Sequence, residues 1–188
     1  RPGGVFPAGG KAGTEVEVSF LGDQGELPNK KINLPSQADP SFAIFADSEG
    51  HISPSPNRFR VSEFADVLEI EPNENRAKVP MPEITPPMAF NGIIQAEGDT
   101  DYFTFKGQKG QRLVFTAHAR SLRSPLDPVM NLYHQEGKSL KSLKGSDDVG
   151  RNPDSKFDFT LPADGQYFLR VRDHLGKGGP NYIYRIEV

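Results

Sequence analysis

The stretch DYFTFKGQKGQRLVFTAHAR, residues 101–120, decides the fold class of this 188-residue chain. Two runs rich in aromatic and β-branched residues flank the turn sequence GQKG, which predicts two strands joined as a hairpin. Comparable runs recur after Phe90, separated by clusters of glycine, proline, asparagine and aspartate. The eight runs are residues 90–95, 101–106, 111–120, 128–135, 138–143, 156–161, 165–172 and 182–188.

These eight runs predict an antiparallel β-sandwich of jelly-roll type over residues 89–188. In GQYFLRVRD, residues 165–173, apolar and polar side chains alternate. Because successive side chains of a strand point to opposite faces, Tyr167, Leu169 and Val171 are predicted to face the core. The later turn GKGGPN is also predicted to close a hairpin.

A smaller all-β domain is predicted before it, over residues 1–66. In TEVEVSFLG, Val16, Val18 and Phe20 alternate with polar residues, which is typical of a half-buried strand. Shorter strand-like runs follow, and none of the segment has a helical period. The sequence therefore predicts an all-β protein built from two β-sandwich domains.

Between the two domains, residues 72–88 contain five prolines. Proline removes a backbone donor and favours extended conformations in the residue before it. Residues 67–88 are therefore predicted to form an extended, acidic connector.

Composition excludes several classes of protein. The chain has no cysteine, so disulfides, thiol catalysis and cysteine-ligated zinc are excluded. The net charge of −3 favours neither nucleic acid nor a membrane surface, and no apolar run is long enough to span a bilayer. The chain begins RPGGVFPAGG, and we expect it to be part of a longer polypeptide.

Two short stretches place oxygen-bearing side chains two residues apart. They are Glu69, Glu71 and Asn73 in LEIEPNEN, and Asp99 and Asp101 in EGDTDYFTF. In an extended chain, residues at this spacing point to the same side. Ca²⁺ takes six to eight oxygen ligands at flexible geometry, whereas Mg²⁺ requires a tighter octahedron. If the stretches converge, the five residues are predicted to bind Ca²⁺.

The same residues carry a resemblance to a known family. EIEPNEN, FNGIIQAEGDTDYFTFKGQKGQRLVF, SPLDPVMNLYHQEGKSL and DSKFDFTLPADGQYFLRVRD together resemble the bacterial pre-peptidase C-terminal domain over about residues 67–188. They are also similar to the collagen-binding domains of clostridial collagenases. FPAGGKAGTEVEV resembles the short Ig-like domain that precedes such modules in exported planctomycete proteins.

The resemblance implies a non-catalytic β-sandwich module of a secreted protein. It also implies calcium held jointly by the acidic connector and the D-x-D-Y-F turn, which correspond here to Glu69, Glu71, Asn73, Asp99 and Asp101.

Other candidate sites are weaker. A second ion site could use Asp147, Asp148 and Asp154, although aspartate is also common in turns. The four histidines lack the spacing of metal ligands, and neither a G-x-S-x-G nor an H-E-x-x-H motif is present. Five basic residues could form one face and are expected to lie on the solvent-exposed side of a sheet: Arg120, Arg123, Arg170, Arg172 and Lys177.

We therefore expect a non-catalytic accessory module of a larger exported bacterial protein, stabilised by Ca²⁺ where the connector meets the sandwich. Its location is expected to be secreted, periplasmic or at the cell surface. Its expected partners are an extracellular protein or polysaccharide and other domains of the same full-length chain, not nucleic acid. Three alternatives stay open: carbohydrate binding, binding of collagen or another fibrous protein, and a chaperone segment removed during maturation. The first two require an outward aromatic patch, for which Phe168, Tyr182 and Tyr184 are the candidates.

Overall fold

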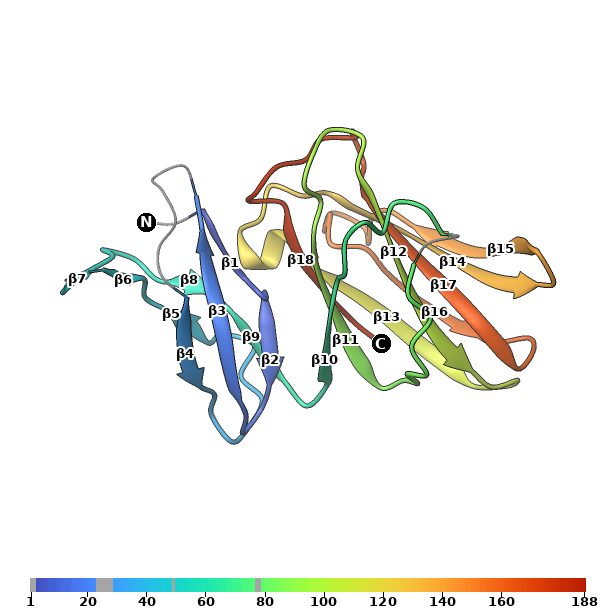
Figure 1. The fold of residues 1–188 in the computed structure, drawn as a ribbon, viewed down its shortest axis with the longest axis horizontal. Helices are drawn as coiled ribbons and strands as arrows, with labels where there is room; N and C mark the ends of the chain where they lie inside the picture. Colours follow the sequence, from blue (N-terminus) through green and yellow to red (C-terminus); the bar gives the residue numbers. More distant parts are fainter. Residues whose placement is uncertain (1–2, 23–28, 49, 77–78) are drawn as a thin grey trace.

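The computed structural model describes residues 3–22, 29–48, 50–76 and 79–188, and these residues form β-strands with one short 3₁₀ helix. Figure 1 shows two bodies side by side, with the N-terminal strands in blue and cyan and the C-terminal strands in green to red. The all-β prediction is confirmed.

The C-terminal body consists of two sheets. Its strands are β10 (Ala65–Leu68), β11 (Met88–Ile93), β12 (Thr100–Gly107), β13 (Arg112–His118), β14 (Pro128–Glu136), β15 (Ser139–Ser146), β16 (Lys156–Thr160), β17 (Gly165–Asp173) and β18 (Ile183–Glu187). One sheet has the order β10-β11-β18-β13-β16, and the other has the order β12-β17-β14-β15. If β11 to β18 are counted one to eight, the orders become 1-8-3-6 and 2-7-4-5, which is the jelly-roll topology. Each of the eight predicted runs supplies one of these strands.

Two predicted hairpins are wrong. GQKG joins β12 to β13, and GKGGPN joins β17 to β18, but in both cases the two strands lie in different sheets. In a jelly roll, successive strands mostly alternate between the two sheets. A short turn therefore leads from one sheet to the other and does not join two hydrogen-bonded neighbours. The turn between β14 and β15 does close a hairpin, with Glu136 opposite Ser139.

The space between the two sheets is filled mainly by aromatic and aliphatic side chains. Phe90 stacks on Phe103 with ring centroids 4.5 Å apart, and Phe115 stacks on Phe157 at 4.7 Å. The predicted core residues of β17, namely Tyr167, Leu169 and Val171, are fully buried in this core. The register of β17 expected from the sequence is therefore confirmed.

The N-terminal body has shorter strands around its own core. They are β1 (Gly4–Phe6), β2 (Gly9–Lys11), β3 (Glu15–Leu21), β4 (Lys30–Asn33), β5 (Ala43–Ile44), β6 (Asp47–Ser48), β7 (His51–Ile52), β8 (Asn57–Arg58) and β9 (Arg60–Ser62). The largest of its sheets has the order β1-β3-β4. Val18 and Phe20 are buried there, as the alternation in TEVEVSFLG predicts. Its kinship to Ig-like domains stays a prediction.

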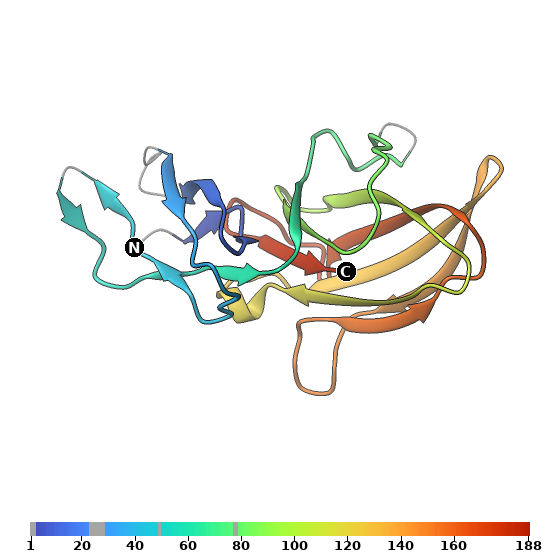
Figure 2. The same cartoon turned by 90° about the horizontal axis from the view of Figure 1, so that it is seen from below.

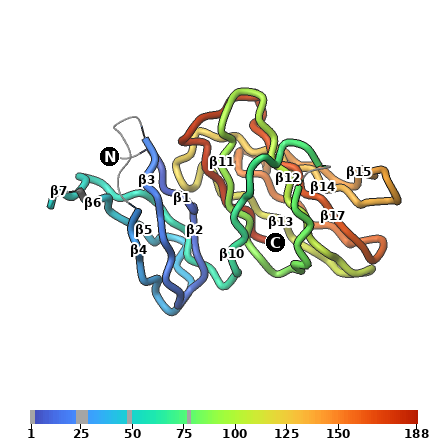
Figure 3. Tube along the Cα trace, in the orientation of Figure 1, coloured from blue at the N-terminus to red at the C-terminus, as the bar shows by residue number. Residues whose placement is uncertain are grey.

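The connector leaves the N-terminal body as a strand. β10 pairs in parallel with β11 and forms the edge of the five-stranded sheet. Among the described residues that follow, the chain has neither helix nor strand until Met88. It returns along the edge of β12, where the Thr104 hydroxyl donates to the Pro80 carbonyl oxygen (2.8 Å) and the Lys106 amide donates to the Ile84 carbonyl oxygen (2.8 Å). Figures 2 and 3 show this green segment against the C-terminal body. The expected domain limits at residues 66 and 88 stay a prediction.

Candidate metal centre at the connector

Glu69 is the first acidic residue after β10, and the pairing with β11 fixes its position. The Glu69 amide donates to the Asn91 carbonyl oxygen (3.0 Å), which extends the ladder by one residue. Its half-buried side chain turns back over β11, where both carboxylate oxygens accept from the Ile93 amide at 3.0 Å. The strand pairing thus sets the backbone, and a single amide orients the carboxylate.

Two residues further along the connector, the side chain of Glu71 binds the backbone of Asn73. One Glu71 carboxylate oxygen, Oε2, accepts from the Asn73 amide at 2.8 Å. The side chain of Asn73 is buried, and neither Oδ1 nor Nδ2 has a hydrogen-bond partner. A buried amide without partners costs free energy, so a ligand that contacts this side chain would be stabilising.

The second acidic stretch lies where β12 begins. Asp99 closes the preceding turn, since its carboxylate accepts from the Gln95 amide (2.6 Å) and the Thr100 amide (2.7 Å). Asp101 is fully buried; its Oδ2 accepts from the Tyr184 hydroxyl, and its Oδ1 has no partner.

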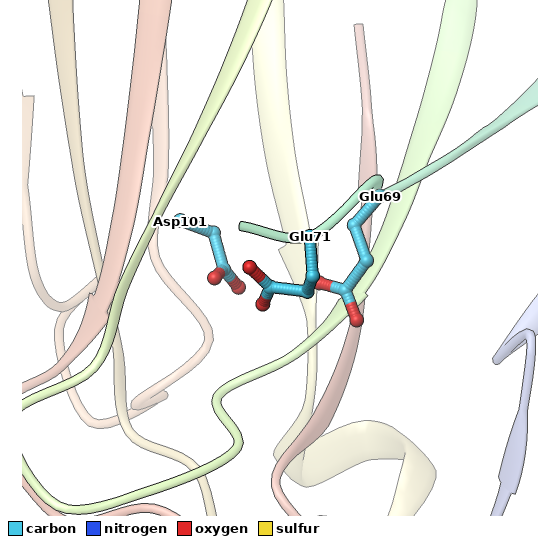
Figure 4. Close-up of side chains that lie close together, drawn as sticks. All are labelled: Glu69, Glu71 and Asp101. Atoms are coloured by element: carbon cyan, nitrogen blue, oxygen red, sulfur yellow. The ribbon is translucent and has the colours of Figure 1, made fainter. Parts of the chain in front are cut away.

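The two stretches meet in space. Glu69, Glu71 and Asp101 each offer one oxygen, and these three atoms lie within 4.8 Å of one another. Figure 4 shows the three carboxylates directed toward one another from the connector and from β12. Asp99 does not belong to this trio, and each of its two oxygens accepts from a backbone amide of the preceding turn or of β12. The close-packed oxygens therefore come from three of the four predicted carboxylates.

This crowding changes the acidity of the carboxyl groups. Burial, followed by the charge of Asp101, raises the pKa of Glu69 to about 9. Burial, with the nearby charges of Asp99 and Glu71, also raises the pKa of Asp101 to about 7, although the Tyr184 hydroxyl opposes the shift. Burial likewise raises the pKa of Glu71. Ionising all three side chains together is unfavourable unless a cation neutralises them.

The donor set fits a hard cation that prefers oxygen. Three carboxylates converge, and Asp101 Oδ1 and Asn73 Oδ1 are buried acceptors without donors. Ca²⁺ binds carboxylate and amide oxygens, whereas zinc sites usually include nitrogen or sulfur ligands.

Sequence reasoning missed two residues that shape the site. Tyr184 of β18 donates to Asp101, and burial raises the pKa of its hydroxyl well above the usual value, so it stays a donor. Gly92 of β11 leaves the space for both neighbours, since a Cβ built there would lie 2.3 Å from the Tyr184 hydroxyl oxygen and 2.5 Å from Glu69 Oε2. Neither residue stands in an acidic motif, so only the cross-strand register reveals them.

Replacing Gly92 by alanine is expected to displace Glu69 and Tyr184 and to lower the free energy of unfolding by about 1–3 kcal/mol. Urea unfolding would measure the loss. Gly4→Ala is the control, because the nearest atom to its Cβ would be the flexible Cδ1 of Ile183 at 3.1 Å. Equal stability of Gly92→Ala and Gly4→Ala would contradict the tight approach.

The other candidate residues do not converge on a site. Asp154 accepts from the Ala119, Arg120 and Ser121 amides and so caps the 3₁₀ helix η1 (Arg120–Leu122), which explains its burial. Asp147 instead lies 3.6 Å from His174. Among the described residues, Glu69, Glu71 and Asp101 form the one such group of acidic or histidine side chains with converging ligand atoms.

Part of the C-terminal body matches a known protein family. Residues 99–173 match the family model of the bacterial pre-peptidase C-terminal domain. A probable subtilase-type serine protease from Deinococcus radiodurans is 38% identical over 74 residues, which make up 39% of this chain and 10% of that protein. The chain thus matches about a tenth of the length of that curated relative. The match to this family model lies within the C-terminal body, in agreement with the resemblance seen in the sequence.

Two solved structures are also similar. The pre-peptidase C-terminal domain of a collagenase from Bacillus anthracis has a TM-score of 0.41 and 17% identity, over 57% of this chain and 95% of that one. PliG, a periplasmic inhibitor of g-type lysozyme from Salmonella Typhimurium, has a TM-score of 0.34 and 18% identity, over 65% of this chain and 96% of that one.

Within the described residues, no helix has the length and apolar character needed to cross a bilayer.

Proposed function

We propose that this chain is a non-catalytic accessory module of a larger exported bacterial protein, and that Ca²⁺ fixes its connector to the jelly roll. The observation that carries the proposal is the meeting of Glu69, Glu71 and Asp101 within 4.8 Å beside buried acceptors that lack donors. The family match supports the accessory role, because the matched segment is a pre-peptidase C-terminal domain.

Each residue of the proposed site has a separate task. Glu69, Glu71 and Asp101 supply the negative charge, and Asn73 supplies a neutral oxygen that is already buried. Asp99 holds the turn before β12 and adds charge nearby, which acts on the pKa of Glu69 and Asp101. Bound Ca²⁺ would contribute charge neutralisation and a link between the connector and β12.

Secretion or display at the cell surface belongs to the same proposal. It draws on the likeness to part of a subtilase-type protease and to a domain of a collagenase. The partner is proposed to be an extracellular protein or polysaccharide, reached together with other domains of the full-length chain.

The aromatic patch that a carbohydrate or fibre site would need is not formed by the expected residues. Phe168 and Tyr184 are buried, and Tyr182 is partly buried against the core. These three side chains therefore give no support to the two binding alternatives.

Millimolar Ca²⁺ is expected to raise the thermal midpoint relative to EDTA by a few degrees. With an affinity near 10⁻⁴ M, typical of extracellular sites, the stabilisation is about 1–2 kcal/mol. Calorimetry of the wild type with EDTA, Mg²⁺ or Ca²⁺ measures it, and the double variant Asp99→Ala, Asp101→Ala is the control that should not respond. An equal midpoint for the wild type in EDTA and in Ca²⁺ would refute the calcium proposal.

A further inference from the structure

The outer face of the five-stranded sheet carries a fully buried arginine. Tyr184 and Ile186 of β18 point into the jelly-roll core, so Arg185 and Glu187 between and beside them point to the opposite face. Arg185 is nevertheless 0% exposed. The N-terminal body supplies the cover: a Cβ on Gly9 of β2 would lie 2.7 Å from Arg185 Cδ.

Side chains from both bodies satisfy this charge. The Arg185 guanidinium donates to Asp66, to Ser62 Oγ at 3.0 Å and, more weakly, to Glu187 Oε1 at 3.3 Å. From the N-terminal body, Arg60 Nε donates to Glu187 Oε1 at 2.7 Å. We call Arg60, Ser62, Asp66, Arg185 and Glu187 the interbody network.

Further contacts make this interface more than an ion pair. Ala8 of the N-terminal segment packs with Leu122 and Ile183 in a small buried apolar cluster. The Arg58 guanidinium donates to the Ser121 carbonyl oxygen at 3.1 Å. The interface thus combines apolar packing with paired charges, as a specific docking surface does.

β10 joins this network to the candidate metal centre. Asp66 accepts from Arg185, from the Lys11 amide of β2 (3.0 Å) and from the Asn91 side chain (3.1 Å). Three residues later, Glu69 pairs with the same Asn91 through its backbone. The short strand β10 therefore carries a residue of the network and ends directly before a residue of the metal centre, and both residues are held against β11.

We infer that docking of the N-terminal body and binding of a cation at Glu69, Glu71 and Asp101 are coupled through β10, so that each strengthens the other. The inference rests on the proposed calcium function. Its physical basis is that undocking takes the Lys11 amide away from Asp66 and Ser62 away from Arg185, another partner of Asp66. This loosens β10, and a loosened β10 no longer holds Glu69 beside Asp101. Thermodynamic linkage makes the effect reciprocal.

The test uses the full chain and two variants, Arg185→Met and Arg60→Met. Calcium affinity is measured by titration calorimetry, and docking is measured by small-angle X-ray scattering. Both variants are expected to scatter as more extended particles and to bind Ca²⁺ at least about fivefold more weakly than the wild type. Arg112→Met is the matched control, because Arg112 lies on the same sheet in an exposed pair with Asp158.

The outcomes separate the two proposals. Failure of the wild type to bind Ca²⁺ would refute the calcium function and the coupling together. Extended variants that bind Ca²⁺ with wild-type affinity would overturn the coupling and leave the calcium function standing. Scattering unchanged in both variants would overturn the role of the interbody network in docking. If Arg185→Met does not fold, Arg60→Met decides, because it alters the network from the N-terminal side.

Discussion

Replacing Arg185 by methionine is expected to lower the free energy of unfolding by about 3–5 kcal/mol, because it takes a fully buried cation from the partly buried Asp66 and leaves the buried Glu187 with Arg60 as its remaining arginine partner. The size of the effect follows from position: the Arg185 side chain is 0% exposed, and that of Glu187 is 7% exposed. The loss of stability arises mainly because the substitution removes a hydrogen-bond donor from the carboxylates of Asp66 and Glu187, which stay partly or fully buried.

Urea unfolding of the full chain at fixed Ca²⁺ measures this loss. The control is again Arg112→Met, whose pair with Asp158 lies mostly in solvent and is expected to contribute little. If Arg185→Met were no less stable than Arg112→Met, the interbody network would not be a determinant of stability.

The second large effect is a loss of stability with rising pH when Ca²⁺ is removed. The pKa values of Glu69 and Asp101 are raised to about 9 and about 7, whereas those of the unfolded chain are the ordinary ones. Both groups therefore bind protons more tightly in the folded protein. The stability that this provides is complete below the unfolded pKa values, near pH 4. It is lost as pH rises, up to about pH 7 for Asp101 and about pH 9 for Glu69, by at most about 1.4 kcal/mol per pH unit for each group.

Thermal midpoints between pH 5 and pH 9 in EDTA test this expectation, provided that they are compared with the same series in millimolar Ca²⁺. Ca²⁺ should flatten the profile, since it compensates the ionised carboxylates. The double variant Glu69→Gln, Asp101→Asn should flatten it in EDTA as well and should no longer respond to Ca²⁺. A wild-type profile in EDTA as flat as that of this variant would contradict the raised pKa values.

Much of the jelly roll could be predicted from the sequence because each strand has a local signature. Alternation in β17 identifies Tyr167 and Leu169 as core residues without any knowledge of the partner strands. What could not be predicted is which strands pair. GQKG and GKGGPN have ordinary turn composition, and a turn that closes a hairpin has the same local chemistry as one that crosses between sheets.

The candidate site, too, could be predicted from the sequence only in part. The spacing of Glu69 and Glu71 indicates one face of an extended chain, and the approach of Asp101 was expected from the family resemblance. Tyr184 and Gly92 could not be found in this way, since one lies more than eighty residues away from Asp101 and the other has no side chain to signal a role. Arg185 looks like a surface residue in an alternating strand, and only the covering body reveals that it is buried.

β10 has a practical consequence for work with fragments. It covers the backbone edge of β11, whose residues Met88–Ile93 are mostly buried. A fragment that begins after Leu68 would keep all eight jelly-roll strands but would expose that edge as a template for strands of other molecules. Poor solubility of such a fragment would then report intermolecular strand addition, and would say nothing against the foldability of the domain itself.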